Sequence, residues 1–172
     1  FVIHGGRPLA GEIVASGNKN AVLPMLAATL LTDEEVVLEN VPDIRDVTSM
    51  LEVLEHLGAE VAREGPVVRV RAAHVKTGEI PRELCEKTRT SFLFVGPLLT
   101  RVDRVKVWAP GGDGIGRRRL DAHLYGLRRL GVAIADDAFE FRAPKAPARL
   151  TGGTLFFDEA SVTATEHILM VA

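Results

Sequence analysis

The 172-residue sequence is poor in cysteine, in aromatic side chains and in net charge. Its single cysteine, Cys85, excludes an internal disulfide framework and favours a reducing compartment, so we expect a cytoplasmic protein. Aromatic residues make up 5% of the chain, and the formal net charge is −2, so no nucleic-acid partner is expected. The longest apolar run, Phe92–Leu99, is far shorter than the ~20 residues that cross a bilayer, so no membrane partner is expected either.

The sequence contains a pattern of helices and strands that occurs twice and then begins again. The first copy predicts a helix over Lys19–Leu31, a strand over Val36–Glu39, a helix over Val47–Leu57, and a hairpin of Glu60–Arg63 with Val67–Arg71. The second predicts a helix over Thr88–Arg101, a strand over Val105–Trp108, a helix over Leu120–Leu130, and a hairpin of Ile134–Asp136 with Phe139–Arg142. A third copy opens with Thr154–Phe157, which echoes Glu12–Ala15, and a helix over Ser161–Ala172.

Units of this kind, β-α-β-α-β-β, bury their helices by stacking on sister copies. We therefore expect an α/β fold of repeated units that is incomplete in this chain, as part of a longer protein. The alternative is an accidental similarity, because alternating helices and hairpins are common.

A glycine-rich turn, 110–116, follows the strand of the second copy and precedes three arginines, 117–119. Four glycines in such a turn allow backbone N–H groups to approach an anion closely. The spacing is not the G-x-G-x-x-G of a dinucleotide site. A surface loop with a solvated arginine cluster explains the composition equally well, so both interpretations stay open.

The starts of the first helices in the three copies carry Lys19, Arg89 and the run Ser161-Val162-Thr163. A lysine at a helix start opposes the helix dipole, at a small cost that a bound anion would offset. Taken alone, Lys19 is as well explained as an exposed side chain. If the copies pack around a shared axis, however, all three starts converge, which predicts an anionic ligand.

Other residues give weaker signals. The five histidines do not occur at metal-ligand spacing, so we expect no metal site and no cofactor. His123 is expected to be a surface histidine of a helix, and Cys85 a small buried hydrophobic residue.

The motifs collected above resemble a known enzyme family. They are Ser16–Ala21, Arg89–Phe92 running to Gly96-Pro97-Leu98, the turn 110–116 with Arg118, Asp121 and His123, and Ser161-Val162 before Ala164-Thr165-Glu166. Together they cover nearly the whole chain, in order, and resemble the UDP-N-acetylglucosamine enolpyruvyl transferases. The sister family, the enolpyruvylshikimate-phosphate synthases, shares the fold but has a serine after its lysine and lacks this glycine-rich loop.

The resemblance implies an inside-out α/β barrel of repeated units, the enolpyruvyl transferase fold. Residues 18–172 would form most of one domain, and residues 1–17 would be strands that pair with a second, C-terminal domain outside this chain. The implied reaction transfers the enolpyruvyl group of phosphoenolpyruvate to the 3-hydroxyl of UDP-N-acetylglucosamine and releases phosphate, the first committed step of peptidoglycan synthesis. The chain alone would be inactive, because half of the active-site cleft lies outside it.

The resemblance also implies roles for individual residues. Asp113 would donate a proton as the catalytic acid, in a loop that closes over the site. Phosphoenolpyruvate would be held by Lys19, Asn20 and Arg118. UDP-N-acetylglucosamine would be held by Arg89, Arg118, Arg119, Leu120, Asp121, Ala122, Ser161 and Val162.

The sequence departs from the family pattern at three positions. Arg119 stands where proline is usual, Thr163 where glycine is usual, and Asp113 where most members have a cysteine. Aspartate is a known minority form at that position. The alternative to an enzyme is a non-catalytic paralogue that binds the nucleotide sugar, although such a binder would not need the acid.

Overall fold

The computed structural model describes residues 1–6, 8–112, 119–135, 139–144, 150 and 152–172. The first repeated unit starts with helix α1 (Lys19–Ala28), which continues through the 3-10 turn η1 (Thr29–Leu31) to strand β1 (Glu35–Leu38). Helix α2 (Arg45–Leu57) then leads to the hairpin of β2 (Glu60–Glu64) and β3 (Val67–Arg71). These bounds confirm the elements predicted for the first copy to within two residues.

The second unit repeats this order with shorter elements. Helix α3 (Arg82–Cys85) precedes the 3-10 helix η2 (Arg89–Phe94), which continues into α4 (Val95–Leu99) and strand β4 (Arg104–Lys106). Helix α5 (Asp121–Arg129) leads to the hairpin of β5 (Ala133–Ala135) and β6 (Glu140–Arg142). The third copy contributes helix α6 (Val162–Leu169).

The two sheets confirm the internal repeat because their topologies are the same. The strand order is β1-β3-β2 in the first sheet and β4-β6-β5 in the second, and every pair is antiparallel. A glycine follows the second helix of each unit, and both of these residues, Gly58 and Gly131, adopt a positive φ, 104° and 95°.

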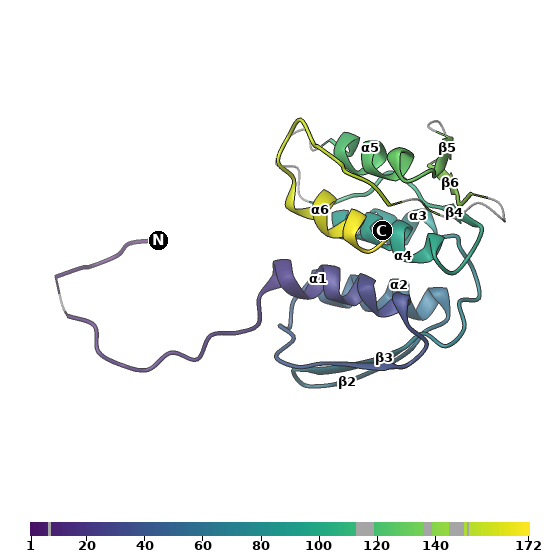
Figure 1. Ribbon diagram of the computed structural model, residues 1–172. Helices are drawn as coiled ribbons and strands as arrows, with labels where there is room; N and C mark the ends of the chain where they lie inside the picture. Colours follow the sequence, from purple (N-terminus) through teal and green to yellow (C-terminus); the bar gives the residue numbers. More distant parts are fainter. Residues whose placement is uncertain (7, 113–118, 136–138, 145–149, 151) are drawn as a thin grey trace.

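Helices occupy the centre of the molecule and the two sheets lie on its outside (Figure 1). All five residues of α4 are buried, whereas side chains along β1 and β2 alternate between partly buried and exposed. Helix α1 packs against α2, η2 and α6, so the units meet through their helices. This is the inside-out arrangement that the resemblance implied.

Two predicted elements differ in the structure. The helix expected over Thr88–Arg101 is divided into η2 and α4, because the backbone N–H of Gly96 donates to Nε2 of His167 (2.8 Å) and Pro97 has no N–H. No strand forms over Thr154–Phe157. One isolated parallel bridge, between Glu79 and Lys106, joins the segment before α3 to β4 and was not predicted. The short helix α3 was not predicted.

One arginine joins the second unit to the first. The guanidinium of Arg101, which follows α4, donates to the carbonyls of Leu30 (2.9 Å) and Thr32 (3.2 Å) with Nη1. Its Nη2 donates to the carbonyls of Ala72 (2.9 Å) and Ala73 (3.2 Å). These four acceptors lie at the ends of the helix and the hairpin of the first unit, so Arg101 fixes the position of one unit on the other.

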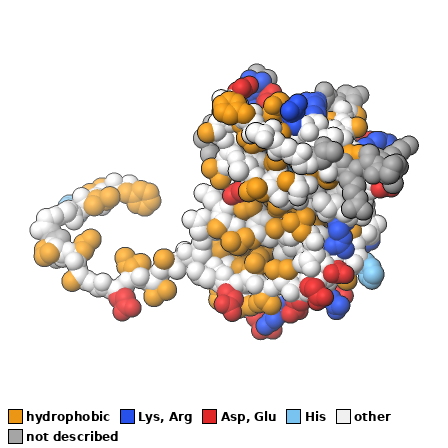
Figure 2. Space-filling model, in the orientation of Figure 1, with side chains coloured by type: hydrophobic (Ala, Val, Ile, Leu, Met, Phe, Trp, Pro, Cys, Tyr) orange, Lys and Arg blue, Asp and Glu red, His pale blue; other side chains and the backbone are white. Residues whose placement is uncertain are grey.

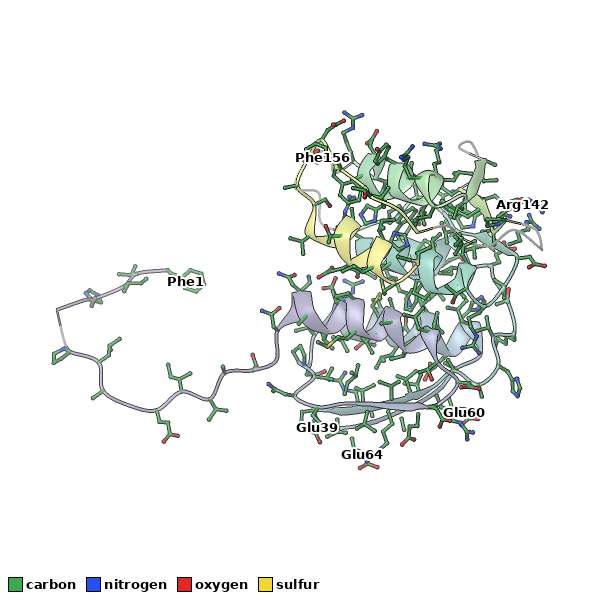
Figure 3. The ribbon with its side chains drawn as sticks, viewed as in Figure 1. Phe1, Glu39, Glu60, Glu64, Arg142 and Phe156 are labelled. Carbon is green, nitrogen blue, oxygen red and sulfur yellow. The ribbon has the colours of Figure 1, made fainter. Side chains whose placement is uncertain are left out.

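The N-terminal segment extends away from the body of the protein (Figures 1 and 2). Residues 1–6 and 8–17 form no strand. The large apolar side chains of this segment are at least 86% exposed, and Phe1 lies at its far end (Figure 3). The strands expected over residues 1–17 are therefore not formed within this chain, since a strand needs a neighbour to satisfy its backbone N–H and C=O groups. Their pairing with a second domain stays a prediction.

Candidate functional site

The first residues of three units meet around one pocket of about 210 Å³. Lys19 begins α1, Arg89 begins η2, and Thr163 is the second residue of α6; all three line the pocket. The convergence predicted from the repeat is thereby confirmed. Of the other residues assigned to substrate by resemblance, Asn20 and Leu120 also line this pocket.

Lys19 is held by an acid of the neighbouring helix. Its Nζ lies 2.9 Å from Oδ2 of Asp46, which is in the first turn of α2, while Thr88 donates to Oδ1 of Asp46 (3.0 Å). Partial burial acts to raise the pKa of Asp46, but the hydrogen bonds from Lys19 and Thr88, with the charge of Lys19, outweigh it and lower this pKa below its ordinary value. Asp46 is therefore an anion that orients Lys19 at the pocket wall.

Arg89 connects the pocket to the start of α5. Its Nη2 donates to the backbone carbonyl of Arg119 (2.8 Å), and a Cβ added to Gly112 would lie 3.4 Å from Arg89. The positive φ of Gly112, 109°, and this close approach explain why a glycine stands there. The backbone and Cβ of Arg89 thus lie beside Gly112, while its guanidinium reaches Arg119 ahead of α5.

A second hollow contains three more of the residues assigned to the nucleotide sugar. Arg119, Asp121 and Ala122 line it together with Tyr125 and the exposed Phe156, which is labelled in Figure 3. Arg119 donates to both carboxylate oxygens of Asp121, at 2.7 and 2.8 Å. The described residues of the predicted set are therefore divided between the pocket, this second hollow and the start of α6.

The remaining predicted residues lie at the start of α6 or outside the described residues. The Ser161 hydroxyl caps α6 by accepting from the N–H of Ala164 (3.2 Å), and Val162 is 72% exposed beside it. Asp113 and Arg118 lie outside the residues that the structure describes.

One expectation about this region was wrong. His123 is a buried residue, only 4% exposed, and it lines the central pocket. Nothing in the α5 sequence distinguished it from a surface histidine, because its burial depends on α6 and η2. Asp46 and Thr88 were also missed: an acid in a first helical turn is common, and only the fold brings it to Lys19.

Other observations limit what the site can do. Cys85 is fully buried, as predicted, and burial raises the pKa of its thiol. Within the described part of the chain, no group of three or more His, Cys, Asp or Glu side chains is arranged to hold a metal ion. No helix in that part is long and apolar enough to cross a membrane.

A model of the EPSP synthase (3-phosphoshikimate 1-carboxyvinyltransferase) family matches residues 3–172. The chain belongs to this family. Among its relatives, proteins named UDP-N-acetylglucosamine 1-carboxyvinyltransferase are 48% identical in Treponema denticola and 45% identical in Borreliella burgdorferi, each over 174 residues. Both alignments include the whole chain and 40% of the relative, so the chain spans about 40% of the length of these proteins.

Solved structures show the same fold. The enolpyruvyl transferase NikO from Streptomyces tendae matches with a TM-score of 0.74 at 24% identity, over 98% of this chain and 40% of that one. An EPSP synthase from Acinetobacter baumannii matches with a TM-score of 0.70 at 12% identity, over 94% and 37%. The expected enolpyruvyl transferase fold, incomplete in this chain, is confirmed.

Proposed function

We propose that this chain supplies one side of the active site of a UDP-N-acetylglucosamine 1-carboxyvinyltransferase. The observation that carries the proposal is the convergence of Lys19, Arg89 and Thr163, from three units, on one pocket. Two cations and a hydroxyl suit a ligand with phosphate and carboxylate groups. The relatives that share 42–48% of this sequence and carry that name support this substrate over shikimate 3-phosphate.

The proposed reaction has two steps. The 3-hydroxyl oxygen of the sugar bonds to C2 of phosphoenolpyruvate and loses its proton to a base, while C3 gains a proton and becomes a methyl group. The resulting tetrahedral ketal then loses phosphate and a methyl proton, which restores the carbon–carbon double bond. As the resemblance to the UDP-N-acetylglucosamine enolpyruvyl transferases implies, we assign this transfer to peptidoglycan synthesis, and hence to cell-wall biogenesis, cell shape and cell division.

The residue roles follow from the resemblance and from the geometry. Lys19, Asn20 and Arg118 would bind phosphoenolpyruvate. The nucleotide sugar would be bound by Arg89, Arg118, Arg119, Leu120, Asp121, Ala122, Ser161 and Val162. The Asp46 carboxylate holds the Lys19 side chain at the pocket wall, where it can reach a phosphate.

Asp113 would be the proton donor to C3. An aspartate has a reference pKa of ~3.9, so this role needs a higher value. A substrate phosphate and carboxylate beside it would raise the pKa by charge repulsion, and exclusion of water would raise it further.

The test of the proposed function uses the complete polypeptide that contains these residues. Given phosphoenolpyruvate and UDP-N-acetylglucosamine, it should release phosphate and form the enolpyruvyl sugar. Asp113→Asn should lose roughly 10²–10⁴-fold in rate, because an amide cannot donate the proton. Asp113→Cys should keep turnover and become sensitive to an epoxide phosphonate that alkylates thiolates, whereas the unaltered protein should resist it.

A second arm of the test examines Lys19. Lys19→Ala removes a charge-assisted contact worth about 1.5–3 kcal/mol and should weaken phosphoenolpyruvate binding accordingly. Lys106→Ala, on strand β4, is the matched control. Phosphate release with shikimate 3-phosphate in place of the sugar would assign the chain to the sister activity. Binding of the nucleotide sugar without turnover would indicate a non-catalytic paralogue.

Residues 1–17 and the rest of the polypeptide belong to the same proposal. The exposed apolar side chains Val2, Ile3, Ile13 and Val14 suit a segment that pairs with a second, C-terminal domain. In the complete polypeptide, backbone amides of residues 2–15 should be protected from hydrogen exchange. We place the protein in the cytoplasm, where a lone thiol stays reduced, and cell fractionation tests this location.

A further inference from the structure

Two histidines form a buried hydrogen-bonded chain behind the central pocket. His167 of α6 is completely buried, and its Nε2 accepts from the backbone N–H of Gly96 (2.8 Å). Its other ring nitrogen, Nδ1, lies 3.0 Å from Nδ1 of His123 in α5. The Nε2 of His123 then lies 3.3 Å from Oγ1 of Thr163, at the wall of the pocket. This chain of hydrogen bonds therefore runs from the backbone amide of Gly96 to the hydroxyl of Thr163 in the candidate site.

The amide at one end determines where each proton lies. A backbone N–H can only donate, so Nε2 of His167 carries no proton, and a neutral imidazole then has its proton on Nδ1. That proton is donated to Nδ1 of His123, which must be the acceptor. The proton of His123 consequently lies on Nε2 and is donated to Thr163 Oγ1.

Both histidines are in an environment that favours the neutral form. Burial, and secondarily the positive charge of Arg89, lower the pKa of His123 to about 4. Burial and the neighbouring His123 lower the pKa of His167 well below its ordinary value. The ring of Phe92 packs edge-on against both, at centroid distances of 5.5 and 5.6 Å.

The hydroxyl of Thr163 accepts from this chain, so its own proton is left for another acceptor. Among the described residues, no carbonyl or carboxylate accepts that proton. Thr165, two residues further along α6, differs because its hydroxyl donates to the carbonyl of Ser161 (2.9 Å) within the helix. Thr163 lines the pocket together with Lys19 and Arg89, and these two cations favour an anionic ligand as the acceptor.

From the two cations beside it, we propose that Thr163 donates its hydroxyl proton to a phosphate-type oxygen of the ligand, and that His123 and His167 are positioning residues that hold the hydroxyl in this orientation. The identity of the ligand, though not the hydrogen-bond chain, rests on the proposed function. The oxygen belongs either to the diphosphate of the nucleotide or to the phosphate of phosphoenolpyruvate. Inorganic phosphate shares the same chemistry.

The experiment measures binding of UDP, phosphoenolpyruvate and inorganic phosphate to the complete polypeptide by calorimetry. Thr163→Val should weaken at least one of the three by about tenfold or more, since a hydrogen bond to a charged oxygen is lost. Thr163→Ser should restore most of that binding, and Thr165→Val should not change it. The arm that responds, UDP or phosphoenolpyruvate, identifies the source of the oxygen.

The positioning role has its own variants. His167→Asn should keep the direction of the hydrogen bonds and hence the binding, because the amide oxygen can accept from Gly96 and the amide N–H can donate to His123. His167→Leu breaks it and should weaken binding as Thr163→Val does. If the leucine variant does not fold, ¹⁵N resonances of the unaltered protein still decide: at pH 7 His167 should be protonated on Nδ1 and His123 on Nε2.

Several outcomes would overturn the proposal. These are equal binding by the Thr163→Val and unaltered proteins, the opposite tautomers, or no binding of any of the three probes to the unaltered protein. Failure of the proposed function is a separate result. In that case no enolpyruvyl sugar forms, while the loss of probe binding in Thr163→Val and the tautomers stay as expected.

Discussion

The two complete units share a strand order but hold their first cation in different ways. In the first unit, Lys19 begins a regular α-helix capped by the Asn18 side chain, and the carboxylate of Asp46 holds its ammonium group. In the second, Arg89 begins a 3-10 helix that has no side-chain cap, and it donates to the carbonyl of Arg119. The repeat thus determines where the cation lies, and the local partners determine which chemistry it can perform.

The largest effect is expected where the second unit contacts the first. Arg101→Met removes the donor of four hydrogen bonds to backbone carbonyls and should lower the free energy of unfolding by about 4 kcal/mol. Chemical denaturation measures the change. Arg69→Met is the matched control, because its exposed ion pair with Glu35 contributes less than about 1 kcal/mol. Equal losses of unfolding free energy in the two variants would show that Arg101 does not fix the second unit on the first.

The next largest effect is a loss of stability at acid pH, which should begin at a higher pH in the second unit than in the first. His123 has a pKa of about 4 in the folded protein and about 6.5 when unfolded, so the unfolded chain binds more protons between these values. Stability should fall by roughly 3 kcal/mol as the pH decreases from 6.5 to 4. Asp46 of the first unit has a lowered pKa, so its contribution is lost only at more acid pH, as the pH falls below the ordinary aspartate pKa and through its own lower pKa.

Hydrogen exchange at pH 7 and pH 5 checks this difference. Amides of α5 and α6 should lose protection at pH 5, whereas local opening of α1 should be unchanged. His123→Phe should remove the part of the pH dependence that comes from His123, and the part that comes from His167, whose pKa is also lowered, should remain. An undiminished pH dependence in this variant would assign the acid sensitivity to other groups.

A smaller effect is expected at Gly96, which occupies the place that Leu26 has in the first unit, counted from Lys19 and Arg89. A Cβ at this position would lie 2.5 Å from Cγ2 of Val171 and 2.7 Å from Cδ2 of His167. Gly96→Ala should therefore cost about 2 kcal/mol of stability, measured by thermal unfolding. Gly153→Ala, where nothing lies within 4 Å of the added atom, is the control.

The smallest effect on stability is expected at Lys19. Its side chain is 47% exposed and that of Asp46 is 32% exposed, so the pair is screened by water. Lys19→Met should change the free energy of unfolding by less than about 1 kcal/mol, in contrast to the loss of substrate binding proposed above. A large destabilisation would mean that Lys19 is retained for the fold and not for a ligand.

Much of the fold could be predicted from the sequence because its signals are local. Asn18 caps α1, Gly58 ends α2, and alternating side chains indicate the β2–β3 hairpin, all within a few residues of the element concerned. The division of η2 from α4 could not be predicted, because the histidine responsible, His167, lies 71 residues from Gly96.

The candidate site was predictable in part for a similar reason. Lys19, Arg89 and the α6 start were found because each begins a repeated helix, and the repeat implied that they converge. Asp46 and His123 reach the pocket only through long-range packing, 27 residues from Lys19 and 44 from His167 respectively. Neither has a sequence neighbour that indicates such a contact.

The four carbonyls that Arg101 contacts also affect how stable the first unit is while the protein is being synthesised. The last of them, Ala73, precedes Arg101 by 28 residues, and synthesis at about 5–20 residues per second adds the arginine about one to six seconds later. During that interval the whole first unit has been synthesised, and water must satisfy these acceptors. The nascent first unit should therefore be fully stabilised only when the ribosome has delivered the following helix. A stall between residues 73 and 101 would leave it marginally stable, so this interval is the point at which a chaperone or a protease would act.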